Sequence, residues 1–182
     1  MNVKIVPKPL TLQSLLNYST SHFANLPSVS FVEGTPITYA ELGIKIEKLS
    51  DLLFTLGLKK GDKVALLSHN MPNWVAAYFS VVSAGLIIVP ILPDFTREEI
   101  ENVLSHSESK CLYISERLSS RIEGLDLPLL ESRISLDTLT LVSGTQHAGF
   151  QKLTTYRCRR RYGGYYIHLW HHGPFKRCGP FA

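Results

Sequence analysis

Residues 38–67 read TYAELGIKIEKLSDLLFTLGLKKGDKVALL. Thr38 and Glu41 have the spacing of a capping box, in which the threonine hydroxyl caps a helix and the glutamate reaches back. A stripe of apolar residues follows at spacings of four and three: Leu42, Ile46, Leu49, Leu53 and Leu56. This stripe predicts an amphipathic helix that stops at Gly57. Residues 63–67 then predict a strand that is apolar on both faces, as in a parallel sheet covered by helices.

The same alternation of helix and strand continues on both sides of this stretch. Loops between the expected elements are short, which predicts an α/β fold with a parallel sheet flanked by helices. Further helices are expected to begin near Leu12, after an N-cap at Asn70, and after Thr96, and a turn of helix is expected after residue 116. Further strands are expected at residues 28–32, 36–38, 86–91, 111–114 and 127–130.

Residues 74–93 contain no charged side chain and have about the length of a membrane-spanning helix. Gly85 and Pro90 interrupt this stretch, however, and the apolar pattern changes at Gly85. We therefore interpret it as a buried helix followed by a buried strand, and we expect no transmembrane segment.

Charge is distributed unevenly along the chain. Residues 1–150 hold 12 of the 19 Lys and Arg and all 15 Asp and Glu, whereas residues 151–182 hold 7 Lys and Arg and no acid. The basic character therefore comes from the last 32 residues. The chain has 3 cysteines, too few for a disulfide framework, which favours a reducing, cytoplasmic location.

Few residues of the first 150 suggest chemistry. His69 and Asn70 follow an expected strand, where open α/β sheets bind ligands, but they also fit a helix cap with an exposed histidine, which we favour. Cys111 opens an apolar strand and fits the core, and Glu98 and Glu99 suit the first turn of a helix. No glycine-rich phosphate loop, metal-ligand cluster or nucleophile elbow occurs in this part of the chain.

The order of motifs resembles the N-terminal region of the AMP-forming acyl-CoA synthetases and related adenylate-forming ligases. The resemblance covers roughly residues 11–115. The segments that carry it are TPITYAEL at 35–42, GLKKGDKVALL at 57–67, NMPNW at 70–74, AG at 84–85 and VP at 89–90.

This resemblance implies an enzyme that activates a carboxylic acid. ATP and the acid, for which the resemblance implies a fatty acid, give an acyl-adenylate and pyrophosphate. Coenzyme A then takes the acyl group as a thioester, and Mg²⁺ assists the reaction in the family. The family's phosphate loop, T-S-G-T-T-G-x-x-K-G, should follow soon after the resembling region. It is absent from the sequence as written.

The tail offers two other interpretations when its residues are taken at face value. Its possible zinc ligands lack the paired spacing of structural zinc sites. They are Cys158, His168, His171, His172 and Cys178. The Arg- and Tyr-rich residues 157–165 could bind RNA as a basic arm of a non-catalytic binding protein, which is the alternative function. Neither interpretation explains the sudden loss of acidic residues.

A shift of reading frame explains both the composition and the missing loop. Codons compatible with residues 166–179, read one base later, can encode I-Y-T-S-G-T-T-G-R-S-K-G-V-V. The junction between Trp170 and His171 allows only glycine in the shifted frame, where the loop needs glycine. We place the slip between about residues 130 and 157.

The sequence thus predicts a partial AMP-binding subdomain at 1–137 and an aberrant, disordered tail at 138–182. The family's substrates are a small carboxylate, ATP and coenzyme A, and we expect no nucleic-acid partner. Since the phosphate loop and everything after it are missing, we predict no catalytic, cofactor-binding or metal-binding residue in this chain, and no activity of the chain alone.

Overall fold

Five strands form the central sheet of the computed structural model, which describes residues 9–144. They are β3 (Lys63–Leu67), β4 (Ile87–Ile91), β5 (Cys111–Ile114), β6 (Ser132–Ser135) and β7 (Leu141–Ser143). Their order is β4-β3-β5-β6-β7; the first four are parallel and β7 is antiparallel to β6. A separate hairpin joins β1 (Pro27–Val29) and β2 (Ile37–Thr38). The expected α/β fold with a mainly parallel sheet is confirmed.

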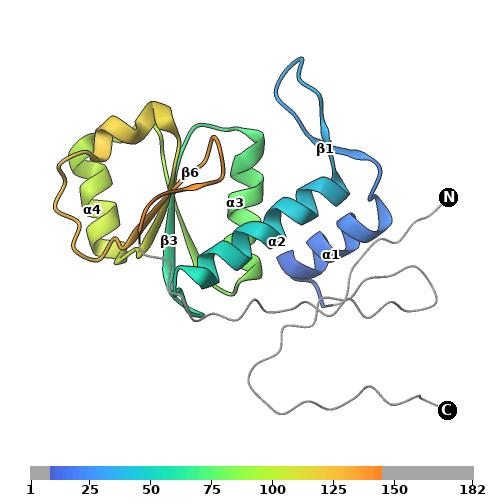
Figure 1. Ribbon diagram of the computed structural model, residues 1–182, viewed down its shortest axis with the longest axis horizontal. Helices are drawn as coiled ribbons and strands as arrows, with labels where there is room; N and C mark the ends of the chain where they lie inside the picture. Colours follow the sequence, from blue (N-terminus) through green and yellow to red (C-terminus); the bar gives the residue numbers. More distant parts are fainter. Residues whose placement is uncertain (1–8, 145–182) are drawn as a thin grey trace, which may run out of the picture.

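Helices cover both faces of this sheet (Figure 1). One face packs against α2 (Tyr39–Thr55) and α3 (Pro72–Ser83), with α1 (Leu12–His22) packed on these two helices, and the other face packs against α4 (Arg97–Ser107) and the 3₁₀ helix η1 (Glu116–Ile122). Alternate residues of β3 serve the two cores: Val64 and Leu66 face the first, Ala65 and Leu67 the second. Burial on both faces explains why this strand is apolar throughout.

The capping signals of the sequence are confirmed. Thr38 caps α2 by accepting the Glu41 N–H at 3.2 Å, and the Glu41 carboxylate accepts the Thr38 N–H at 2.8 Å. Thr96 and Glu99 repeat the same pair of bonds at the start of α4. Each box satisfies backbone donors that the first turn of a helix leaves without partners.

Residues 74–93 form most of α3, a turn and β4, as predicted. No helix in residues 9–144 has the length and apolar character needed to cross a membrane. Strand β4 is an edge strand, and the Ile87 N–H donates to the Asp62 carbonyl beside β3. Since successive residues of a strand alternate direction, Pro90 lies at a position that faces away from β3, where its missing N–H removes no ladder bond.

Two expectations about local structure are wrong. Met71, not Asn70, is the N-cap of α3, and it makes no side-chain cap bond; Pro72 supplies the preset first-turn geometry instead. The sixth strand lies at Ser132–Ser135 rather than at 127–130, because Leu127 and Leu130 pack from a loop against the α4 core. Strand β7 occupies residues that the sequence assigns to the tail.

Candidate functional site

The carboxyl edge of the sheet is the place where this topology can bind a ligand. The chain runs from β3 outward to β4 and then returns past β3 to β5, with α3 on one face and α4 on the other. This reversal makes the ends of β3 and β5 a topological switch point, where open α/β sheets place their ligands. The residues that follow the two strands are Ser68 and Ser115, both buried.

The two serines at the switch point differ in their hydrogen bonds. The Ser68 hydroxyl donates to the His69 carbonyl at 2.8 Å, while the Ser115 hydroxyl has no partner within the described residues. His69 is half-buried and Asn70 is exposed, so the structure brings the predicted histidine to this edge. Neither residue forms part of a catalytic pair in residues 9–144.

Asp137 connects the ends of β5 and β6 to helix α3. Its carboxylate accepts the Glu116 N–H at 2.7 Å, and its carbonyl accepts the Asn73 side-chain amide at 3.1 Å. The Asn73 amide also donates to the Leu136 carbonyl at 2.9 Å, and Lys45 of α2 donates to the Asn73 side-chain oxygen at 3.4 Å. These bonds hold the loops of the carboxyl edge in one arrangement, which favours a positioning role over a chemical one.

Two arginines meet at the other side of the same edge. Arg121 of η1 donates to the carbonyls of Pro93 and Phe95 at 2.6 and 2.7 Å. Arg97 of α4 donates to the carbonyls of Arg121 and Glu123. Within residues 9–144 neither guanidinium forms an ion pair, so the two positive charges are candidates for contact with an anion. Sequence reasoning missed them, because only the fold brings residues 97 and 121 together.

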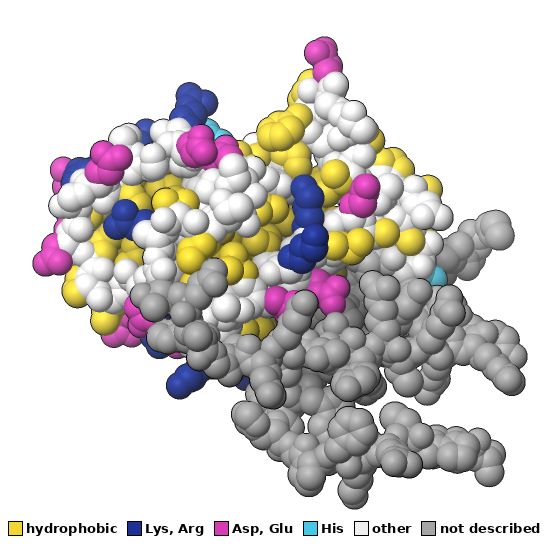
Figure 2. Space-filling view, in the orientation of Figure 1, with side chains coloured by type: hydrophobic (Ala, Val, Ile, Leu, Met, Phe, Trp, Pro, Cys, Tyr) yellow, Lys and Arg dark blue, Asp and Glu magenta, His cyan; other side chains and the backbone are white. Residues whose placement is uncertain are grey.

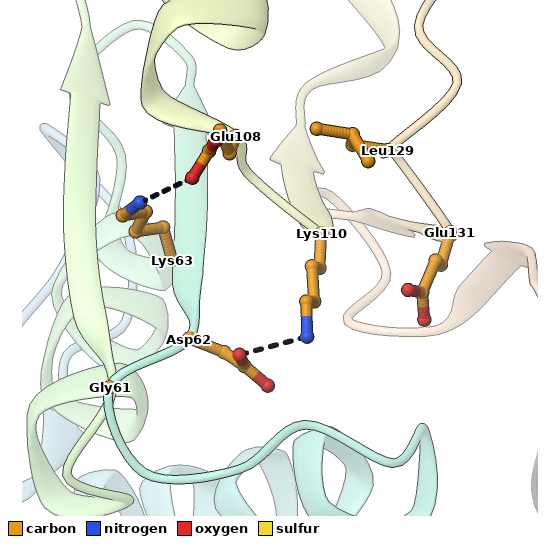
Figure 3. A pocket seen from close by; sticks show the side chains of 7 residues that line it. All are labelled: Gly61, Asp62, Lys63, Glu108, Lys110, Leu129 and Glu131. Carbon is orange, nitrogen blue, oxygen red and sulfur yellow. Dashed lines mark hydrogen bonds and ion pairs between the residues drawn. The ribbon is translucent and has the colours of Figure 1, made fainter.

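The amino edge of the sheet holds a hollow of about 270 Å³ (Figure 3). Two ion pairs lie beside it: Lys110 contacts Asp62 at 2.9 Å, and Lys63 contacts Glu108 at 3.0 Å. The Asp62 carboxylate also accepts the Lys59 N–H at 2.7 Å. These contacts tie the start of β3 to the start of β5 and the end of α4. The hollow lies opposite the ligand-binding edge, so its charges are structural.

The other predicted residues have structural surroundings as well. Cys111 is fully buried, and burial raises the pKa of its thiol to about 12, which makes it an inert core residue. Glu99 completes the capping box of α4, and Glu98 is exposed in the same first turn.

The described residues contain no group of three or more His, Cys, Asp and Glu side chains able to hold a metal ion. The tail residues considered for zinc and RNA lie outside the described residues, as does the segment proposed to be read in a shifted frame.

The fold and the site define the class of protein: a doubly wound α/β unit whose ligand-binding edge lies at a topological switch point. The sequence model of the AMP-binding enzymes matches residues 18–155. The chain therefore belongs to this family of AMP-binding enzymes, and the predicted resemblance is confirmed.

Individual relatives are CoA ligases. Crotonobetaine/carnitine–CoA ligase of Escherichia fergusonii is 40% identical over 43% of this chain and 15% of its own length. Long-chain-fatty-acid–CoA ligase of Bacillus subtilis is 34% identical over 72% of this chain and 21% of its own length. The chain thus spans about a fifth or less of the length of these curated relatives.

Solved structures share the fold. A Mycobacterium tuberculosis fatty acyl CoA synthetase superposes with a TM-score of 0.57 at 26% identity, covering 60% of this chain and 22% of that one. The N-terminal domain of FACL13 from the same organism gives a TM-score of 0.63 at 26% identity over 69% of this chain and 33% of that one. For the anthranilate CoA ligase AuaEII with anthranoyl-AMP, the TM-score is 0.64 at 24% identity, over 66% and 24% of the two chains.

Proposed function

We propose that this chain is the N-terminal part of an ATP-dependent ligase that activates a carboxylic acid as an acyl-adenylate and transfers it to coenzyme A. The observation that carries this proposal is the family match over residues 18–155 on a sheet of the family's fold. A fatty acid is the proposed substrate class, because the long-chain-fatty-acid ligase of B. subtilis matches 72% of this chain, more than the carnitine ligase does.

We further propose that Arg97 and Arg121 contact a phosphate group of ATP or coenzyme A. Both guanidinium groups lie at the binding edge of the sheet, and each is held by backbone carbonyls that leave its charge without a carboxylate partner in residues 9–144. A guanidinium fixed in this way retains donors for a phosphate oxygen.

The chain as written should not catalyse the adenylation. The family match ends at residue 155, and the segment after it has bulky residues where the expected phosphate loop has small ones. Pro174 and Pro180 also lack the N–H groups with which such a loop binds phosphates. We propose that this segment is the loop read in a shifted frame, with the slip between about residues 130 and 157 and an aberrant tail after it.

An exchange assay tests this function. We expect no fatty-acid-dependent exchange of pyrophosphate into ATP by the chain as written. Expression of the same gene with the frame restored by one base should give exchange well above background. Exchange by the chain as written would contradict the proposed inactivity, and a restored, folded protein without exchange on any carboxylic acid would contradict the proposed reaction.

A further inference from the structure

The 3₁₀ helix η1 carries two adjacent serines that differ in their hydrogen bonds. Ser119 and Ser120 are both exposed, whereas Leu118 and Ile122 of the same helix are buried in the core against α4. The Ser119 hydroxyl donates to the Glu116 carbonyl at 2.8 Å. The Ser120 hydroxyl forms no hydrogen bond within residues 9–144. Of the two serines, Ser120 therefore presents a free hydroxyl to solvent.

Ser120 also has the charge pattern of a kinase substrate. Arg117 precedes it by three positions, and many serine kinases select an arginine at this position. Of the serines and threonines in residues 9–144, only Ser120 has an arginine there. Arg117 is exposed and forms no ion pair within these residues. Because residues three apart lie on the same side of a 3₁₀ helix, Arg117 and the Ser120 side chain face solvent together.

Arg97 and Arg121 bring two more positive charges to this corner of the molecule. The Arg97 guanidinium donates to the carbonyls of Arg121 and Glu123, which lie one and three residues after Ser120. Glu116 and Glu123 place a carboxylate at each end of η1. Figure 1 shows η1 above α4 at the top left, and Figure 2 shows basic and acidic side chains mixed over that end. A phosphate group here would lie beside guanidinium donors, which bind phosphate oxygens strongly.

We propose that Ser120 is a phosphorylation site that regulates anion binding by Arg97 and Arg121. The proposal rests on the proposed function, in which these arginines contact a phosphate of ATP or coenzyme A. A phosphate on Ser120 adds nearly two negative charges. It takes guanidinium donors that the ligand needs and repels the phosphate of the ligand, so phosphorylation weakens ligand binding.

The phosphate comes from ATP through a serine kinase that selects arginine three residues before the acceptor. The Ser120 oxygen forms a bond to the γ-phosphorus, and the bond from this phosphorus to the β–γ bridging oxygen breaks. The hydroxyl proton passes to a base of the kinase, and ADP leaves. Hydrogen bonds of a 3₁₀ helix have poorer geometry than those of an α-helix, so η1 can open locally to enter the kinase.

Treatment of the full 182-residue chain with such a kinase tests the site. Mass spectrometry should locate the phosphate on Ser120. The substitution Arg117→Ala should slow its incorporation by about tenfold. Ser119→Ala is the matched control and should leave the rate within about twofold. Incorporation that persists unchanged in Ser120→Ala, or no incorporation into the folded chain, would overturn the assignment of the site.

Titration with pyrophosphate tests the regulation. We expect the phosphorylated chain to bind pyrophosphate about fivefold more weakly than the unmodified chain. Ser120→Ala treated with the same kinase should retain the affinity of the unmodified chain. Equal affinity of the phosphorylated and unmodified chains would overturn the regulation. An unmodified chain that binds no pyrophosphate would contradict the proposed phosphate contact of Arg97 and Arg121 and the regulation with it, whereas the kinase reaction at Ser120 is judged by its own result.

Discussion

At the scale of single residues, Asp62 belongs to the GLKKGDKVALL motif, but its contacts stabilise the fold. It follows Gly61 in the turn before β3 and contacts both the Lys59 N–H and the Lys110 ammonium. Burial, the largest influence, raises the pKa of the Asp62 carboxyl, but these hydrogen bonds and charges together hold the pKa below its usual value. The same pair raises the pKa of Lys110.

The depressed pKa of Asp62 predicts an acid-dependent stability. The unfolded chain binds a proton to this carboxyl at higher pH than the folded chain does. The stabilisation is therefore complete above the ordinary pKa of aspartate and is lost as the pH falls through the folded value. Asp62→Asn should lower the free energy of unfolding by roughly 1–2 kcal/mol at pH 7 and by much less near pH 3.

Urea unfolding at the two pH values measures this difference. Asp126→Asn is the control, because Asp126 is exposed and forms no ion pair within residues 9–144. An equal effect of Asp62→Asn at both pH values would show that the carboxylate charge is not what stabilises this turn.

The buried hydroxyl of Tyr113 gives a second prediction at this scale. It lies 3.2 Å from the Ser80 hydroxyl, which also donates to the Ala77 carbonyl, and burial raises the pKa of Tyr113. Tyr113→Phe should cost about 1 kcal/mol of unfolding free energy. In a double-mutant cycle with Ser80→Ala we expect a coupling of at least about 0.5 kcal/mol. Strictly additive losses would mean that the two hydroxyls do not interact.

At the scale of the elements, the two capping boxes are the best-determined starts of helices. Thr96→Ala removes the acceptor for the Glu99 N–H and should destabilise the protein by about 1 kcal/mol. Ser105→Ala, at an exposed position of the same helix, should change stability by less than about 0.5 kcal/mol. Thermal melts of both variants provide the measurement, and similar losses from both would argue against a specific cap at Thr96.

The elements also show which features could be predicted from sequence. The helix starts at Thr38 and Thr96 and the strand at Lys63–Leu67 agree with prediction because capping and two-sided burial are local signals. Strand β6 reads Ser-Arg-Ile-Ser, with no apolar run, and is a strand because β5 supplies its partner. Leu127 and Leu130 led to the opposite error: they lie in a loop and are apolar because they cover the α4 core.

The candidate site was less predictable than the fold. Its groups come from helices and loops far apart in the chain, such as Arg97 with Arg121, and Asn73 with Asp137. Only the strand order, which one sequence does not reveal, brings these residues to the same edge. His69 could be assigned to that edge beforehand because it lies two residues after the end of a strand whose direction was clear.

At the scale of the whole molecule, the chain combines an ordered α/β unit of the AMP-binding family with a basic tail whose composition differs from it. The described unit contributes a binding edge and two arginines. The proposed reaction additionally requires a phosphate loop, and the sequence as written contains none. The proposed reaction therefore depends on what the gene encodes after the family match ends.

The nucleotide sequence across codons 130–182 and beyond the stop tests this claim most directly. We predict that the frame read one base later encodes T-S-G-T-T-G-x-x-K-G opposite residues 166–179 and then continues open with further AMP-binding sequence. A shifted frame that lacks this loop, or that closes at once, would contradict the claim and leave the tail as a genuine part of this protein.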